Sequence, residues 1–164
     1  MKALVLAFLL IASPVLAQDK PVLAVPDDIS YVTAIANPIS AAIAAYRVPS
    51  GEKVCAFGRL AITELVGNGA TIGIKHWVVS PRPCLGCAPD GEPSGHTMNS
   101  VLGSSSAQWW NLGGWQRWAL SAGMVALTGF LRHDANRHTW FQIVSGALIG
   151  AGAEAAGHLL RCES

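Results

Sequence analysis

Charged residues are scarce in this chain of 164 residues. Only 13% are Asp, Glu, Lys or Arg, and 11 basic side chains stand against 10 acidic ones. A chain without a basic excess is not a general polyanion binder, so nucleic acid is not an expected partner. Apolar–polar alternation with a period of two is also nearly absent, which argues against a β-sheet.

Two kinds of cysteine-based cofactor site are missing as well. The motif CLGC at residues 84–87 lacks the following His of a haem-attachment motif. A zinc knuckle would need a second close pair, whereas Cys55 and Cys162 stand alone. We therefore expect no metal and no cofactor. An even number of cysteines in an exported protein indicates disulfides, and the sequence leaves the pairing open.

What the chain does contain begins with a targeting segment. Residues 1–17 combine a basic residue at position 2, an apolar run, a break at Pro14 and a small-residue ending, as in a cleaved secretory signal peptide. An uncleaved membrane anchor is the alternative. Residues 18–164 suffice for one domain and are too few for two. We expect an exported, periplasmic protein, either soluble or attached to the membrane.

The apolar residues come in helix-length blocks rich in Ala, Leu and Gly. This pattern predicts an all-α domain, a single helical bundle of about five to six helices. The predicted helices are residues 29–46, 59–77, 97–110, 115–132 and 139–161. Segments rich in Pro, Gly and Asp separate them.

Run length bears on whether these helices cross a membrane. Uncharged stretches such as residues 118–131 and 143–153 are shorter than the roughly 18 residues that a bilayer crossing needs. Polar residues and a proline at 37–40 interrupt the one stretch that is long enough. The sequence therefore favours a soluble or peripherally attached bundle. Gly146 and Gly150 form a GxxxG pair, which either mediates dimerisation in a membrane or lets two helices approach closely.

Three polar segments stand out in the second half of the chain. They are Lys75 with Arg82 and Pro83, the sequence PSGH at 93–96, and Arg132 with His138. In this order and spacing they resemble the signature of the type 2 phosphatidic acid phosphatase superfamily, which also contains bacterial class A acid phosphatases and vanadium haloperoxidases. That signature reads Lys-x6-Arg-Pro, Pro-Ser-Gly-His and Ser-Arg-x5-His-x3-Asp. The resemblance implies a helical bundle, in agreement with the periodicity.

The residue types in these segments suit a phosphate site. Ser94 and Gly95 open a helical block, where backbone N–H groups can bind an anion. Lys75, Arg82 and Arg132 supply positive charge, and each of the two guanidinium groups can bind two phosphate oxygens at once. We expect these five residues to bind the substrate phosphate.

By resemblance, His138 is expected to be the nucleophile that forms a phosphohistidine, and His96 the general acid that protonates the leaving oxygen. The resemblance implies that no metal takes part, although a vanadate occupies the same pocket in the haloperoxidases. The signature is incomplete in this chain. Leu131 stands in place of its Ser, and Gln142 stands in place of its final Asp.

Gln142 lies one helical turn beyond His138. Its amide oxygen can accept the ring N–H and so orient the nucleophile, but it adds no negative charge. Asp134, in the preceding turn, is close enough to substitute for the missing carboxylate, whereas Glu154 lies roughly 24 Å along the helix. Gln142→Asp is expected to raise the chemical rate, provided that the acid has room and a hydrogen-bond partner in place of the lost amide.

The loop between Arg82 and Ser94 contains two of the cysteines. At least one disulfide is expected to involve Cys84 or Cys87 and to hold the two phosphate-binding segments together. The tryptophans within residues 109–118 are expected to be core residues, with an acyl-chain groove or a membrane surface as alternatives.

The sequence thus predicts an exported phosphatase of a phosphomonoester or pyrophosphate, acting on a small-molecule or lipid phosphate. The alternative is a phosphate-binding protein of low or no activity, because Gln142 replaces the motif Asp. A vanadium haloperoxidase is a third hypothesis, although the known members are much larger chains.

Overall fold

The computed structural model describes residues 28–107 and 114–161. Within these ranges the chain forms α2 (Asp28–Arg47), α3 (Ser50–Trp77), α4 (Gly95–Val101), α5 (Gly114–Asp134) and α6 (Trp140–His158). The same residues form no strand, and an isolated bridge pairs Ser80 with Asp90. The predicted all-α bundle is confirmed. The predicted signal peptide at residues 1–17 lies outside the described residues.

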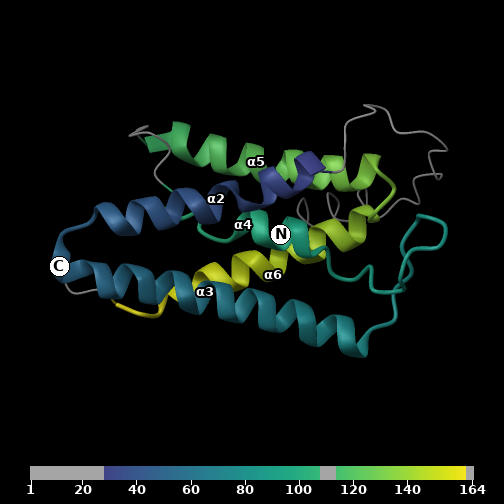
Figure 1. Ribbon diagram of the computed structural model, residues 1–164, viewed down its shortest axis with the longest axis horizontal. Coiled ribbons are helices and arrows are strands. Elements are labelled where there is room, and N and C mark those ends of the chain that lie inside the picture. Colours follow the sequence, from purple (N-terminus) through teal and green to yellow (C-terminus); the bar gives the residue numbers. More distant parts are fainter. Residues whose placement is uncertain (1–27, 108–113, 162–164) are drawn as a thin grey trace, which may run out of the picture.

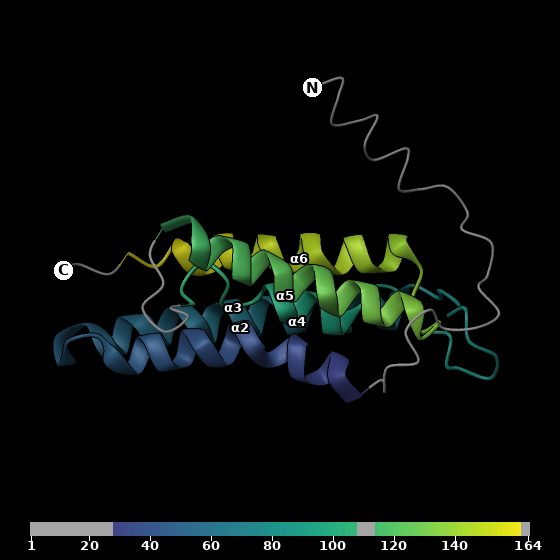
Figure 2. The ribbon, with the colours of Figure 1, turned by 90° about the horizontal axis from the view of Figure 1, so that it is seen from above.

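Four long helices lie side by side around the short α4 (Figure 1). α4 packs against each of the other four helices and is the centre of the bundle. α3 and α5 run in one direction, and α2 and α6 run in the other (Figure 2). As a result, the C-terminal ends of α3 and α5 share one end of the bundle with the N-terminal ends of α2, α4 and α6.

Two helix boundaries differ from the prediction. α3 begins at Ser50 rather than at residue 59, directly after an extended Pro49. A proline is tolerated at a helix start because its missing N–H is not needed there. α4 ends at Val101 rather than at residue 110, since Gly103 takes a φ of 78° and its backbone lies against α2. Residues 108–110 lie outside the described part of the chain.

α2 runs without a break through the polar segment at 37–40, in agreement with the helix predicted at residues 29–46. Pro38 lies inside a continuous helix. Asn37 is fully buried, and its Nδ2 donates to the carbonyl oxygens of Ser100 at 2.6 Å and Ser121 at 3.2 Å. Asn37 thus joins α2 to α4 and α5. Judged by length and composition, one helix of the described part, Ile29–Arg47, is able to cross a membrane, and 44% of it is buried.

The GxxxG pair brings α6 against α4. A Cβ at Gly146 would overlap the carbonyl oxygen of Ser94, and one at Gly150 would lie 2.8 Å from the carbonyl oxygen of Met98. Only glycine allows two backbones to approach this closely. The pair therefore serves a contact within the bundle, and it places the start of α4 beside α6.

Candidate functional site

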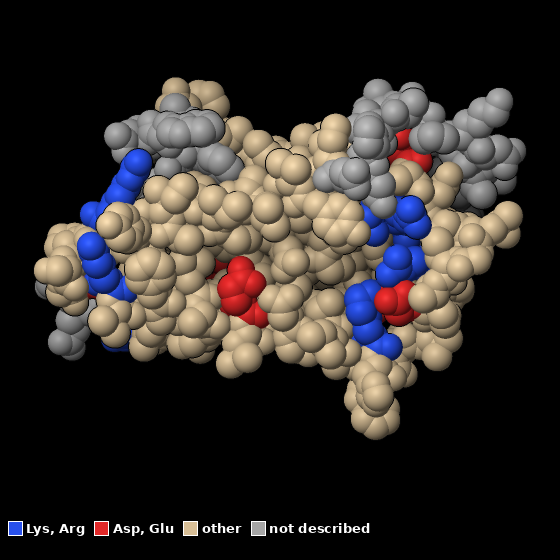
Figure 3. All heavy atoms as spheres, viewed as in Figure 1, with Lys and Arg blue, Asp and Glu red and all other residues tan. Residues whose placement is uncertain are grey.

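The predicted phosphate-binding segments meet at one end of the bundle. Lys75 is in the last turn of α3 and Arg132 is in the last turn of α5, while His138 precedes α6. The loop of residues 78–94 leads from α3 to the start of α4 at the same end (Figure 1). Lys and Arg side chains gather there on the molecular surface (Figure 3).

The turn between α5 and α6 brings Arg132 and His138 together. The backbone N–H groups of Arg137 and His138 both donate to the carbonyl oxygen of Arg132, at 3.0 and 3.2 Å. Asn136 takes a φ of 53° in this turn, a conformation that Asn adopts more readily than most residues. His138, Arg132 and the neighbouring Leu131 are all buried. The sequence spacing thus becomes a compact turn that holds a guanidinium and an imidazole in the interior.

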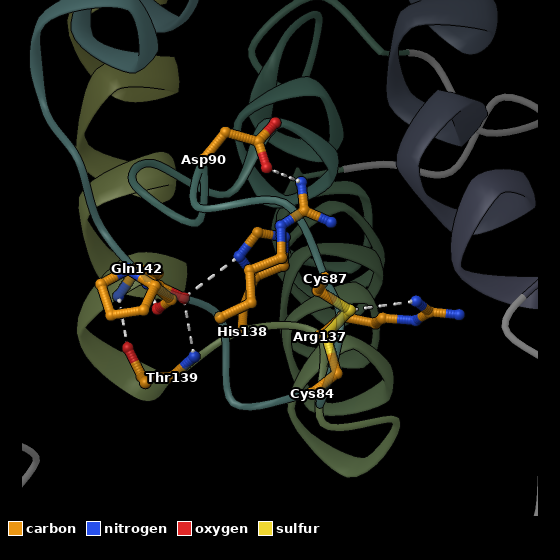
Figure 4. The surroundings of a disulfide bond; sticks show 9 residues. Cys84, Cys87, Asp90, Arg137, His138, Thr139 and Gln142 are labelled. Carbon is orange, nitrogen blue, oxygen red and sulfur yellow. Dashed lines mark hydrogen bonds and ion pairs between the residues drawn. A yellow bond between two sulfur atoms is a disulfide. The ribbon is translucent and has the colours of Figure 1, made fainter.

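Gln142 uses both ends of its amide. Its Oε1 accepts a hydrogen bond from Nδ1 of His138 at 3.3 Å and one from the backbone N–H of Thr139 at 3.0 Å (Figure 4). Its Nε2 donates to Oγ of Ser80 at 2.9 Å and to the carbonyl oxygen of Pro81 at 3.0 Å. Since Oε1 can only accept, the ring carries its proton on Nδ1 and keeps a lone pair on Nε2.

Gln142 therefore also joins α6 to the 78–94 loop. Its carbonyl oxygen accepts the backbone N–H of Ser94 at 2.8 Å, and Gly91 leaves room for its side chain, which a Cβ there would overlap. Sequence reasoning assigned Gln142 only the contact with the imidazole. The available signal was the capping box that Thr139 and Gln142 form at the start of α6, which predicts a fixed Gln side chain.

His138 is neutral under ordinary conditions. Burial, followed by the positive charges of Arg132, Arg82 and Lys75, lowers the pKa of its imidazole to about 3, against a smaller opposite effect of the hydrogen bond to Gln142. An uncharged ring has a lone pair free to attack an electrophile.

Asp90 is a residue of this site that sequence reasoning missed. Its carboxylate forms an ion pair with Arg82 at 2.9 Å, and its carbonyl oxygen accepts a hydrogen bond from Nζ of Lys75. The loop holds Asp90 in place by backbone hydrogen bonds. The N–H of the neighbouring Gly91 donates to the carbonyl oxygen of Ser80 at 2.7 Å. No local pattern indicates this pairing, because it depends on how the loop folds back. An incoming phosphate would compete with Asp90 for the guanidinium.

Ser94 is the N-cap of α4. Its Oγ accepts hydrogen bonds from the backbone N–H and the Oγ1 of Thr97, at 3.5 and 3.0 Å. Its own N–H donates to Gln142. The expectation that this N–H points at a bound anion is therefore wrong, since the group already has a partner within the protein. Ser94 instead fixes the start of α4 against α6.

Gly95 and His96 follow this cap as the first two residues of α4. The imidazole of His96 meets the ring of Tyr31 edge to face, with 4.3 Å between ring centroids and 76° between planes. Such a contact orients the imidazole. Tyr31 comes from the distant start of α2, and nothing in the sequence pattern links it to the PSGH segment.

Cys84 and Cys87 form a disulfide, as predicted, and Cys55 is disulfide-bonded as well. Oxidised cysteines indicate an oxidising compartment. The Cys84–Cys87 bond closes a turn of four residues. It does not itself join the Arg82 and Ser94 segments, contrary to the expectation. That connection is made by the backbone bonds of Ser80 and by the amide of Gln142.

The two acidic residues considered as substitutes for the motif Asp differ in position. Glu154 accepts hydrogen bonds from the turn at 103–105, which lies away from His138, as expected. Asp134 is buried at the end of α5. The Nδ1 of His138 faces Gln142.

No family model, no curated protein and no solved structure matches this chain. The residues of the site are therefore the only indication of what this chain does.

Proposed function

We propose that this chain is a phosphatase that releases phosphate from an ester or pyrophosphate through a phosphohistidine on His138. The observation that carries the proposal is a buried imidazole at the end of the bundle where Lys75 and Arg132 also lie. The hydrogen bond to Gln142 fixes the proton on Nδ1, so the lone pair is on Nε2. A nucleophile near several cationic side chains suits an anionic electrophile such as a phosphoryl group.

In the proposed reaction, Nε2 of His138 forms a bond to phosphorus while the bond to the leaving oxygen breaks. His96 gives its proton to that oxygen. A water molecule then attacks the phosphohistidine, returns a proton to His96 and displaces the imidazole as the P–N bond breaks. Lys75, Arg82 and Arg132 would balance the charge on the phosphoryl oxygens in both steps.

A second candidate is a phosphate-binding protein that does not turn over. This reading is favoured by Gln142, whose amide adds no negative charge to His138 and is committed to the 78–94 loop. An imidazole with a strongly lowered pKa is also a weaker nucleophile. Both readings use the same cations, and they differ in whether a covalent intermediate forms.

The cellular location and substrate class belong to the same proposal. The disulfides and residues 1–17 support export to the periplasm. The substrate would be a phosphate monoester or pyrophosphate, carried either by a small molecule or by a lipid.

The test is phosphate release by the purified full chain, screened against soluble phosphate esters, phosphatidic acid and polyprenyl pyrophosphates. His138→Ala should abolish turnover, while His96→Ala should mainly slow substrates with poor leaving groups, which need protonation. His158→Ala is the matched control, because this exposed histidine lies at the end of α6 remote from the site.

Vanadate separates the two candidates. A phosphatase should be inhibited by vanadate, which adopts the five-coordinate geometry of the transition state, and should form a phosphohistidine in a single turnover. Tight vanadate binding without an intermediate would favour the binding protein. Absence of both vanadate binding and phosphate release would refute the site.

A further inference from the structure

The bundle has a polar interior and an apolar exterior. Six of the ten buried hydrophobic residues of the described part are alanines, and sixteen polar or charged residues are buried beside them. By contrast, 24 large hydrophobic side chains are exposed. A water-soluble bundle has the opposite distribution, with Leu, Ile and Phe inside. Small and polar residues between helices are typical of bundles whose outside is hydrocarbon.

The exposed apolar residues form continuous stripes on the long helices. On α2 they are spaced three or four apart, the spacing of one helix face: Val32, Ile35, Ile39, Ile43 and Tyr46. The polar residues at 37–40 of the same helix include buried Asn37 and Ser40, which face the interior. The outward face of α2 is therefore uninterrupted.

The other three long helices carry the same feature. Leu65 and Ile72 are exposed on α3, Leu127 and Phe130 on α5, and Phe141 and Leu148 on α6. Because the four helices surround α4, these faces form a belt around the molecule rather than one patch. A protein partner or a second copy of the chain would cover only one side of such a belt. Lipid covers all sides.

The dimensions of the belt and the position of its charges fit a bilayer. The four helices have 20, 28, 21 and 19 residues, or about 28–42 Å at 1.5 Å per residue, against a hydrocarbon thickness of roughly 30 Å. Lys and Arg lie at the two ends of the face in Figure 3, and its middle is free of them. Glu64 on α3 is an acidic exception, half-buried and hydrogen-bonded to Asn68.

Tyrosine and tryptophan add an independent observation. Every one of them in the described part lies near a helix end: Tyr31, Trp77 and Trp140 at the end with the phosphate site, and Tyr46, Trp115 and Trp118 at the other. Five of these six are exposed. Two aromatic girdles flanking an apolar band are typical of membrane proteins. Trp115 and Trp118 are thus not core residues.

The geometry points to a lipid bilayer as the partner of this surface: the bundle is an integral membrane domain, with the phosphate site at one end of its apolar belt. This proposal differs from the expectation of a soluble or peripherally attached bundle. Under this proposal, run length underestimates the other helices, because it counts interior polar residues and helix-end charges as if they faced lipid. Glu154, which ends one of the short runs, is buried against the turn at 103–105.

The inference does not depend on phosphatase activity, and fractionation tests it. Membranes from cells that produce the full chain are washed with alkaline carbonate, which removes peripheral proteins. The protein should stay in the pellet and require detergent. After reconstitution into phosphatidylcholine vesicles with brominated acyl chains, its tryptophan fluorescence should be strongly quenched, which would not occur if residues 1–17 alone anchored a soluble bundle.

A matched pair of substitutions locates the contact with lipid. Leu148→Lys places a charge on an exposed position in the middle of α6 and should reduce the membrane-inserted yield several-fold. Leu159→Lys lies beyond α6, is also exposed, and should have no effect. Four results would each overturn the inference. They are release of the protein by carbonate, a monodisperse soluble monomer or dimer without detergent, unquenched tryptophan fluorescence, and equal membrane yields of the two variants.

Discussion

Replacing Gln142 by Asp should destabilise the protein rather than speed its chemistry. Asp is shorter by one methylene and has no N–H, so the bonds to Ser80 and to the Pro81 carbonyl are both lost. The Oγ of Ser80 loses a donor, although its hydroxyl is free to rotate, and the carbonyl oxygen of Pro81 is left without this donor. Two lost bonds of roughly 1 kcal/mol each, plus one unsatisfied acceptor, amount to about 2–4 kcal/mol. The corresponding fall in Tm is about 5–15 °C.

The gain in rate expected from the sequence depended on a partner replacing the amide. In the structure both Nε2 bonds hold the 78–94 loop on which Arg82 and Asp90 lie, and a shorter Asp would lose both of them. Gln142→Glu distinguishes the effect of side-chain length from the effect of losing the amide N–H. It keeps the length of the side chain but sets a carboxylate oxygen against the Pro81 carbonyl, and it should lose nearly as much stability.

The assay is thermal unfolding of the three proteins in one detergent or buffer, together with single-turnover phosphohistidine formation. Ser80→Ala is the control, because it removes one acceptor and should cost only about 1 kcal/mol. A Gln142→Asp protein with unchanged Tm and a faster chemical step would refute the account of the amide as the support of the loop.

Three further outcomes follow from the site. The pKa of His138 is lowered from 6.5 to about 3, so between these pH values the unfolded chain binds a proton that the folded chain does not. The free energy of unfolding should therefore fall as the pH drops from 6.5 towards 3. His138→Asn should reduce this dependence of the unfolding free energy on pH, measured by unfolding at several pH values. Asp90→Asn removes the ion pair with the guanidinium of Arg82 and should tighten vanadate binding several-fold, measured by calorimetry. Glu92→Gln is the control: it removes a nearby charge but leaves this ion pair, and it should have a smaller effect. Gly146→Ala forces α4 from α6 and should cost about 1–3 kcal/mol, whereas Gly152→Ala meets open space on the same helix and should leave Tm unchanged or raise it.

The helices were predictable because their signal is local. The predicted block at 115–132 corresponds to Gly114–Asp134, and that at 139–161 corresponds to Trp140–His158. The end of α4 was not predictable from the sequence, because it depends on Gly103, whose backbone lies against α2. A close approach between distant segments leaves no mark on the periodicity of either one. The contact between His138 and Gln142 was predictable for the opposite reason, since residues four apart share a helix face.

The remaining errors have one physical cause, which is that the interior of this bundle is polar. Asn37 was counted as an interruption of an apolar stretch, and Gln142 as a residue that only orients the imidazole, because periodicity does not reveal which face of a helix is buried. In the structure both amides point inward and join three segments each. A neutral imidazole and a guanidinium remain buried only where such groups surround them. The polar interior that surrounds these groups therefore also leaves the large apolar side chains to face outward, so the proposed phosphate site and the proposed lipid-facing belt have the same origin.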